Sequence, residues 1–180
     1  MRATSVETLL TTRRFHVERR LYDHGHGKTV DKFVVVHPGA AVILPLLDQE
    51  RIVMIRNFRH SVEKELLELP AGTLEPGEPP IETARRELIE ETGYKCGRIE
   101  PMMEFYVSPG VITERMHAYL AKDLTWVGQR LEDSEKITVE IVTLAKAREW
   151  VTEGSLRDGK TIAVLGTFLA RMDSAVQGKR

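Results

Sequence analysis

Residues 80–93 constrain the fold more than any other segment, because both boundaries of a short helix can be read from them. Pro80 can begin a helix, since the first N–H groups of a helix lack intrahelical partners. Gly93 can adopt the left-handed conformation that ends one. The helix should pack against a sheet through three apolar residues at helical spacing: Ile81, Ala84 and Leu88.

The same helix carries three glutamates at positions i, i+3 and i+4, so their carboxylates share another face. Glu87, Glu90 and Glu91 repel one another by about 0.2–0.5 kcal/mol per pair. Their place near the helix C-terminus adds about 0.3–1 kcal/mol. They could be ordinary surface glutamates. A divalent cation would relieve the conflict, since hard cations bind several oxygen ligands, so we predict that the trio tolerates its repulsion only because such ions bind it.

The stretch GTLEPGEPPIETARRELIEETGY resembles the Nudix box, G-x5-E-x7-R-E-U-x-E-E-x-G-U with U apolar. It matches at each specified position: Gly72, Glu78, Arg86, Glu87, Leu88, Glu90, Glu91, Gly93 and Tyr94. Nine residues at fixed spacing make this a specific motif. The resemblance implies an α/β/α sandwich and hydrolysis of a nucleoside diphosphate linked to another group.

The resemblance also implies which residues bind metal, with Mg²⁺ expected and Mn²⁺ possible. Glu87 and Glu91 are expected to be direct ligands, with Glu90 a ligand or close support. The carbonyl of Ala71 is expected to be a further ligand, because the turn at Gly72 exposes the backbone. An ion pair should orient the ligand helix: Arg86 with Glu78.

Segments outside the box are similar to ADP-ribose pyrophosphatases and related nucleotide-sugar hydrolases. These are RNFRHSVEKELLELPAG at 56–72, SPGVITER at 108–115, and the late pattern LEDSEKITVEIV followed by EGSLRDGKTIAVL. This similarity favours an ADP-sugar over a nucleoside triphosphate, with a nucleoside monophosphate and a sugar phosphate as products. The alternatives are GDP-mannose, a dinucleotide, or a sensor that binds a nucleotide sugar without cutting it.

Catalysis further requires a base that activates water. The resembled subfamily usually draws a glutamate from the loop before the late strand. Here we expect Glu135 first and Glu132 second. Glu114, in the SPGVITER segment, could instead position water or a metal, and Glu90 could also serve as the base. An acidic loop without a chemical role is the alternative.

The substrate also needs groups that bind its phosphates and nucleoside. Arg59 is our first candidate for a phosphate contact, with Arg56 second, because a guanidinium binds phosphate oxygens bidentately. Glu68 could contact the nucleoside, and Pro109 lies at about the offset that the subfamily shows. Either arginine could instead be a charge on the surface of a strand, and Glu68 a carboxylate at a strand edge.

The hydrophobic pattern predicts an α+β fold, a mixed sheet covered by helices, with an antiparallel N-terminal strand layer. Strands are expected at 14–22, 32–37, 40–47, 51–58, 99–107, 115–121 and 139–144, and helices at 80–92, 145–153 and 160–171. Strands 40–47 and 51–58 should form a hairpin, and the ends, 1–10 and 173–180, should be loose. We divide the chain into an N-terminal β layer (1–39), a Nudix hydrolase domain (40–173) and a polar tail (174–180).

Composition narrows the range of partners. The net charge is −1, without the basic excess that a nucleic-acid binder usually carries. The single cysteine excludes an intrachain disulfide, and no segment has the apolar length of a signal or a membrane span. We therefore expect a cytoplasmic protein that binds neither nucleic acid nor membrane. The resembled subfamily exchanges its extra strands between two subunits, which implies a homodimer.

Overall fold

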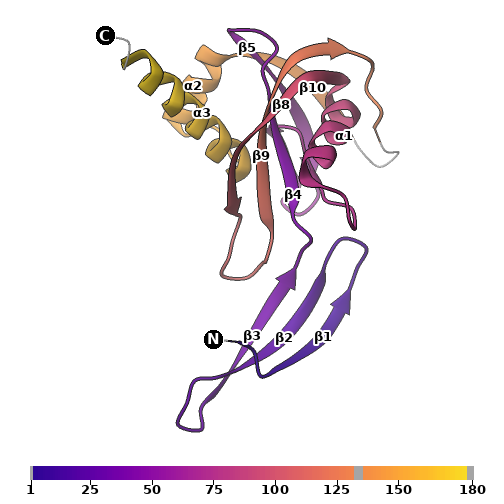
Figure 1. The fold of residues 1–180 in the computed structure, drawn as a ribbon, viewed down its shortest axis with the longest axis vertical. Coiled ribbons are helices and arrows are strands. Elements are labelled where there is room, and N and C mark those ends of the chain that lie inside the picture. Colours follow the sequence, from indigo (N-terminus) through magenta and orange to yellow (C-terminus); the bar gives the residue numbers. More distant parts are fainter. Residues whose placement is uncertain (1, 132–135, 178–180) are drawn as a thin grey trace.

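The computed structural model describes residues 2–131 and 136–177, which form a mixed α+β body and a smaller projecting sheet (Figure 1). The strands are β1 (Ser5–Thr11), β2 (His16–Asp23), β3 (Thr29–Val36), β4 (Ala40–Pro45), β5 (Arg51–Arg59), β6 (Lys64–Glu68), β7 (Ala71–Thr73), β8 (Tyr94–Tyr106), β9 (Arg115–Trp126) and β10 (Ile137–Thr143). The helices are α1 (Pro80–Thr92), α2 (Leu144–Glu153) and α3 (Gly159–Gln177). None of the described helices has both the length and the apolar character needed to cross a membrane.

Two sheets form the body, one in the order β7–β4–β9–β8 and the other in the order β10–β5–β6. The first is mixed, because β4 runs antiparallel to β7 and parallel to β9. Helix α1 lies on one side of the sheets, and α2 and α3 lie on the other (Figure 1). This arrangement confirms the predicted layered α+β fold.

Strand β4 holds the layers together, because its alternate residues face opposite sides of the sheet. Ile43 packs in one apolar cluster with Ala84 and Leu88 of α1. Val42 and Leu44 pack in another cluster, with residues of β5, α2 and α3. The strand is therefore buried on both faces, as its continuous apolar sequence predicts.

Helix α1 has the bounds that its sequence predicts. It begins at Pro80 and ends where Gly93 takes φ 76°, with the Gly93 N–H donating to the Ile89 carbonyl. Such a left-handed cap favours glycine.

The predicted hairpin of strands 40–47 and 51–58 is wrong. Strands β4 and β5 lie in different sheets, and the chain between them turns back only locally, through a bridge between Leu46 and Ile52 and a 2.8 Å hydrogen bond from the Leu47 N–H to the Arg51 carbonyl. Both edges of β4 are already occupied, by β7 and by β9. No edge of β4 is left for β5, which pairs with β6 and β10 instead.

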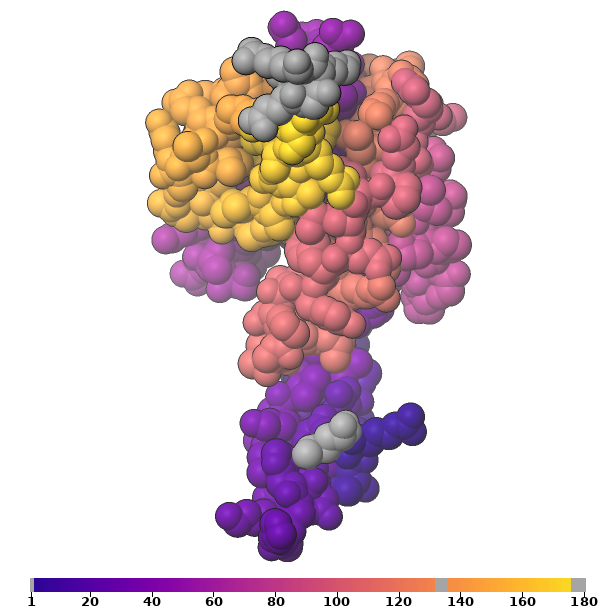
Figure 2. Space-filling view, turned by 60° about the vertical axis from the view of Figure 1, so that its left-hand side comes forward, coloured from indigo at the N-terminus to yellow at the C-terminus, as the bar shows by residue number. Residues whose placement is uncertain are grey.

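The N-terminal strands β1, β2 and β3 form a separate antiparallel sheet, which we call the arm sheet. It projects from the body in Figures 1 and 2. Its link to the body includes backbone hydrogen bonds of Val35 with Val111 and Thr113, both at 2.9 Å. The expectation that residues 1–10 are loose is wrong, because β1 pairs with β2 through backbone groups that a hydrophobic pattern does not reveal.

Helix α3 also differs from its prediction. It continues to Gln177, where we expected a loose end after 173. Leu165 and Leu169 are buried, whereas Ile162 and Met172 are exposed. Thr161 and Val164 are buried as well, and Thr161 Oγ1 accepts a hydrogen bond from the Leu69 N–H, next to the end of β6.

Candidate active site

Glu87 of α1 and Gly72 of β7 lie in close contact. A Cβ atom built on Gly72 would lie 1.8 Å from Glu87 Oε1 and 1.9 Å from Glu87 Cδ. No side chain larger than hydrogen fits there while Glu87 keeps its position. The glycine therefore serves a close approach between the backbone and a carboxylate.

Glu91 is the most buried of the three helix carboxylates, with 3% of its surface exposed. Its Oε2 accepts a 2.8 Å hydrogen bond from the Ala71 N–H. This bond fixes the carboxylate against the start of β7, beside Gly72. The start of β7 and the last turn of α1 are thereby held together.

Arg86 forms the centre of an ion-pair network on the same helix. Its Nη2 lies 3.1 Å from Glu78 Oε2, and its Nη1 lies 2.7 Å from Glu87 Oε1 and 2.9 Å from Glu90 Oε2. Hydrogen bonds with Glu78 raise the pKa of Arg86, and the same bonds lower the pKa of Glu78. The predicted pair of Arg86 with Glu78 is present, and it is extended by two further carboxylates.

This network corrects the physical argument from the sequence. We expected only divalent ions to relieve the repulsion among Glu87, Glu90 and Glu91. Instead, Arg86 Nη1 lies within hydrogen-bond distance of both Glu87 and Glu90. A helical pattern places Arg86 one residue before Glu87, but it does not show that the guanidinium turns toward both carboxylates.

A cavity of about 280 Å³ opens beside Gly72 and joins residues that are distant in sequence. Its wall combines cations, carboxylates and backbone: Ala40, Arg59, Ala71, Gly72, Thr73, Val107, Glu114, Met116, Asp158, Gly159 and Lys160. Arg59 and Lys160 both bind Glu68, which is fully buried. The hydrogen bonds that Arg59 donates to Glu68 raise the pKa of Arg59, which keeps the guanidinium charged.

The chain matches known proteins over most of its length. A family model described as the NUDIX domain matches residues 36–165. The chain belongs to the Nudix family. The family is therefore the one that the Nudix box suggests. The box runs from Gly72 in β7 to Tyr94, the first residue of β8.

Relatives within the Nudix family act on several substrates. The chain is 39% identical to the ADP-ribose pyrophosphatase of Bacillus subtilis (strain 168), over 76% of this chain and 75% of that protein. It is 38% identical to the methanol dehydrogenase activator of Bacillus methanolicus, over the same shares. It is 33% identical to the GDP-mannose pyrophosphatase of Salmonella typhimurium, over 82% of this chain and 75% of that protein.

A solved structure shares the fold of this Nudix protein. The crystal structure of an ADP compounds hydrolase superposes with a TM-score of 0.81 at 24% identity, covering 99% of this chain and 96% of that one. The fold match includes the N-terminal strands, which the family model leaves out. Taken together, the family and its relatives identify the chain as a Nudix pyrophosphohydrolase.

Nudix hydrolases generally use divalent metal ions, and the donors here are of the chemical type that such ions bind. Glu87, Glu90 and Glu91 offer hard oxygen ligands beside Gly72, where the absence of a side chain brings Glu87 close to the backbone. Within residues 2–131 and 136–177, no three His, Cys, Asp or Glu side chains are already gathered around one point as metal ligands, so the carboxylates would have to turn toward the ion. The residues that would hold the ion are these three glutamates and Ala71.

The other predicted site residues are divided among several places. Arg59 and Glu114 line the cavity, and Glu114 Oε1 lies 3.7 Å from His37 Nδ1. Arg56 lies outside the cavity, where it pairs with Glu140 and Glu65. Glu132 and Glu135, the two favoured bases, lie outside the described residues.

Glu68 does not take the place that we expected, and Pro109 lines a different cavity from the one beside Gly72. Glu68 has no exposed surface, and its carboxylate is bound by Arg59 and Lys160, so it cannot reach a nucleoside. A strand-edge position in the sequence does not reveal that α3 covers it. Pro109 lines a second cavity of about 580 Å³, between the arm sheet and the turn that joins β8 to β9.

Sequence reasoning missed Lys160, Asp158 and His37. The segment EGSLRDGKTIAVL carries the first two, and its likeness to the subfamily was visible, but no role could be given to either residue. Only the fold brings Lys160 to Glu68, which lies 92 residues earlier. Asp158 and Lys160 form a charged pair at the predicted start of a helix, and this pair was the signal that could have found them.

Proposed function

We propose that this Nudix protein hydrolyses the pyrophosphate bond of ADP-ribose or a related nucleoside diphosphate sugar in a metal-dependent reaction. The products would be a nucleoside monophosphate and a sugar phosphate. The observation that carries this proposal is the cavity that Arg59 and Lys160 line together with Gly72 of the Nudix box. A diphosphate needs such cations next to metal ligands.

The residues of the chain divide the chemistry between them. A bound Mg²⁺ or Mn²⁺ would neutralise charge on the diphosphate and lower the pKa of a coordinated water. Glu87, Glu90 and Glu91, with the Ala71 carbonyl, would hold it, and Arg86 with Glu78 would orient the ligand helix. Water oxygen attacks one phosphorus, the P–O bond to the bridging oxygen breaks, and that oxygen leaves on the other phosphate.

A general base must take the proton from the attacking water. We propose Glu135, with Glu132 and Glu114 as alternatives; Glu114 is the one that the described cavity contains. Single changes to Gln in each residue should identify the base, because its loss is expected to lower kcat about 10²–10⁴-fold with little effect on metal affinity. Equal kcat for Glu135→Gln and the wild type would move the role to another residue.

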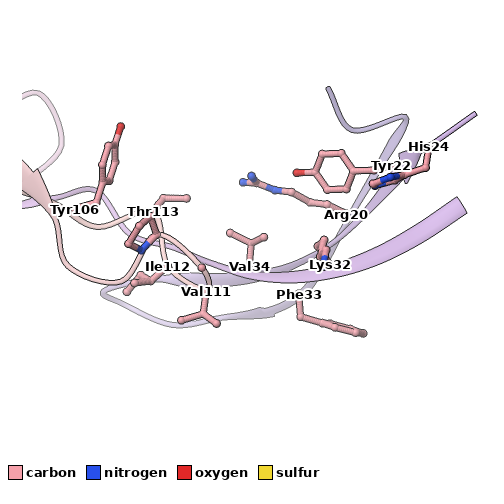
Figure 3. Close-up of a pocket in the computed structure, with 12 residues that line it drawn as sticks. Arg20, Tyr22, His24, Lys32, Phe33, Val34, Tyr106, Val111, Ile112 and Thr113 are labelled. Carbon is pink, nitrogen blue, oxygen red and sulfur yellow. The ribbon is translucent and has the colours of Figure 1, made fainter. Parts of the chain in front are cut away.

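The second cavity is a candidate site for the nucleoside, which would assign Pro109 to substrate binding. Arg20, Tyr22 and Val34 lie on one side of the arm sheet there, and Phe33 points to the other side (Figure 3). An aromatic ring and a guanidinium can both stack on a base.

A GDP-sugar is the second candidate substrate, because the GDP-mannose pyrophosphatase similarity extends over 82% of the chain.

We further propose that the protein is a homodimer in which the arm sheets cover each other. Apolar side chains are exposed on the arm sheet and on the adjoining turn, a pattern that favours a partner surface: Val6, Leu9, Leu10, Phe15, Phe33 and Val111. The arm sheet has three strands and shares no apolar cluster with the described core. A three-stranded sheet needs a hydrophobic face for its stability, and a second arm sheet would keep that face from water.

The dimer can be tested with Phe33, which is 59% exposed. Phe33→Asp is expected to shift the mass measured by multi-angle light scattering from two chains to one, because a buried unpaired charge opposes association. Ile141→Asp is the matched control, since Ile141 is 50% exposed but lies on β10, away from the arm sheet. A wild-type protein that is monomeric at working concentration would end the proposal.

The function itself is tested by a product assay on purified protein. The assay would compare ADP-ribose, GDP-mannose, a dinucleotide and a nucleoside triphosphate, each with Mg²⁺ and with a chelator. We expect the highest kcat/KM for a nucleoside diphosphate sugar and none with the chelator. Binding without any turnover across the panel would instead support a sensor that binds a nucleotide sugar without cutting it.

The cytoplasmic location and the absence of nucleic-acid partners stay predictions.

A further inference from the structure

Glu68 is a buried carboxylate whose position the proposed chemistry does not explain. Arg59 Nε lies 2.8 Å from Oε1, Arg59 Nη2 lies 2.5 Å from Oε2, and Lys160 Nζ also binds Oε2. Removing a carboxylate from water costs several kcal/mol unless cations compensate. One anion inside the protein therefore holds two cations that reach it from β5 and from α3.

The start of α3 is fixed in the same place by three further hydrogen bonds. Asp158 Oδ2 accepts from the Thr161 N–H at 3.0 Å, and Asp158 Oδ1 accepts from Lys160 Nζ at 2.9 Å. Thr161 Oγ1 accepts from the Leu69 N–H at 2.8 Å. The turn of residues 158–161 is thereby fastened to the end of β6, and the Lys160 ammonium has little freedom to move.

Both cations face the cavity beside the Nudix box, whereas Glu68 does not. Arg59 and Lys160 line that cavity together with Gly72, and Glu68 has no exposed surface. Within the described residues, Glu68 and Asp158 occupy two of the three N–H groups of Lys160. Glu68 occupies two of the five N–H groups of Arg59. Donors are thus left over for a ligand in the cavity.

We propose that Lys160 and Arg59 bind the same phosphoryl group of the substrate diphosphate, and that Glu68 is the positioning residue that sets their spacing. This inference rests on the proposed function and adds Lys160 and Glu68 to it. Two cations that share one carboxylate oxygen must lie close together, as two oxygens of one phosphate do. Charge-assisted hydrogen bonds to phosphate are about twice as strong as neutral ones.

The first test is Lys160→Gln in the full chain. We expect KM for the preferred nucleotide sugar to rise about ten- to hundredfold, the effect of losing one hydrogen bond to a charged group, with a smaller loss in kcat. Inhibition by inorganic phosphate should weaken by a similar factor. Lys160→Arg should recover most of the affinity. Lys122→Gln on β9 is the control and should leave KM unchanged, since Lys122 pairs with Glu100 away from the cavity.

The second test addresses Glu68 as a positioning residue. Glu68→Gln should raise KM by a larger factor in the wild type than in the Lys160→Gln background, because only the wild type still has both cations whose spacing Glu68 sets. A structural role alone would lower the melting temperature by the same amount in both backgrounds and leave KM unmoved. If Lys160→Gln does not fold, Lys160→Met keeps the aliphatic stem and gives the same readout.

The outcomes separate this inference from the proposed function. Wild-type turnover with an unchanged KM and unchanged phosphate inhibition in Lys160→Gln would overturn the inference and leave the function standing. Absence of turnover on any nucleotide sugar would overturn the function. Calorimetric titration of the wild type and Lys160→Gln with inorganic phosphate would then still decide whether these cations bind a phosphoryl group.

Discussion

Replacing Glu91 by Gln is expected to lower nucleotide-sugar turnover by roughly a thousandfold while the protein stays folded. A bound metal supplies several kcal/mol of charge stabilisation in the transition state, and each 1.36 kcal/mol corresponds to a factor of ten. Glutamine keeps the shape of Glu91 and can still accept the hydrogen bond from the Ala71 N–H. The substitution therefore removes the charge and leaves the contact that joins α1 to β7.

The matched control for Glu91→Gln is Glu82→Gln on the same helix. Glu82 lies in the first turn of α1, exposed and away from Gly72. Both variants should melt within a few degrees of the wild type, whereas only Glu91→Gln should lose Mn²⁺ affinity in a calorimetric titration. Near-normal turnover in Glu91→Gln would remove Glu91 from the set of metal ligands.

Local features of the sequence were enough to place α1 and the Nudix box. Pro80 and Gly93 mark the ends of the helix, and the apolar stripe with Ala84 and Leu88 marks its buried face. Each of these features acts within a few residues of its effect. The continuous apolar run of β4 likewise predicted a strand buried on both faces, because such burial needs apolar residues at every position.

Strand partners and side-chain directions could not be read in the same way. Strand β4 pairs with β9, and Ala40 lies opposite Met116, far along the chain. Hydrophobic pattern identifies a central strand without naming its neighbours. Two cations at the site could not be predicted for the same reason. The tertiary structure brings Lys160 to Glu68, and the rotamer of Arg86 brings its guanidinium to Glu90.

The position of Gly72 leads to the second large effect, a loss of activity without a loss of stability. A Cβ at this position would overlap the Glu87 carboxylate, with Oε1 at 1.8 Å, and Gly72 does not adopt a positive φ. Alanine is therefore acceptable to the backbone, and only the end of a flexible side chain has to move. Gly72→Ala should lower turnover about a hundredfold, since misplacing a catalytic group by about 1 Å costs that much.

The cause of that loss can be isolated with Glu87. If Gly72→Ala acts by displacing the Glu87 carboxylate, the double variant Gly72→Ala with Glu87→Gln should be no less active than Glu87→Gln alone. Gly166→Ala on α3 is the control, because a Cβ there meets open space and alanine favours a helix. Its activity should equal that of the wild type, with an equal or higher melting temperature. A Gly72→Ala protein that turns over normally would show that the Glu87 carboxylate need not occupy this position during the reaction.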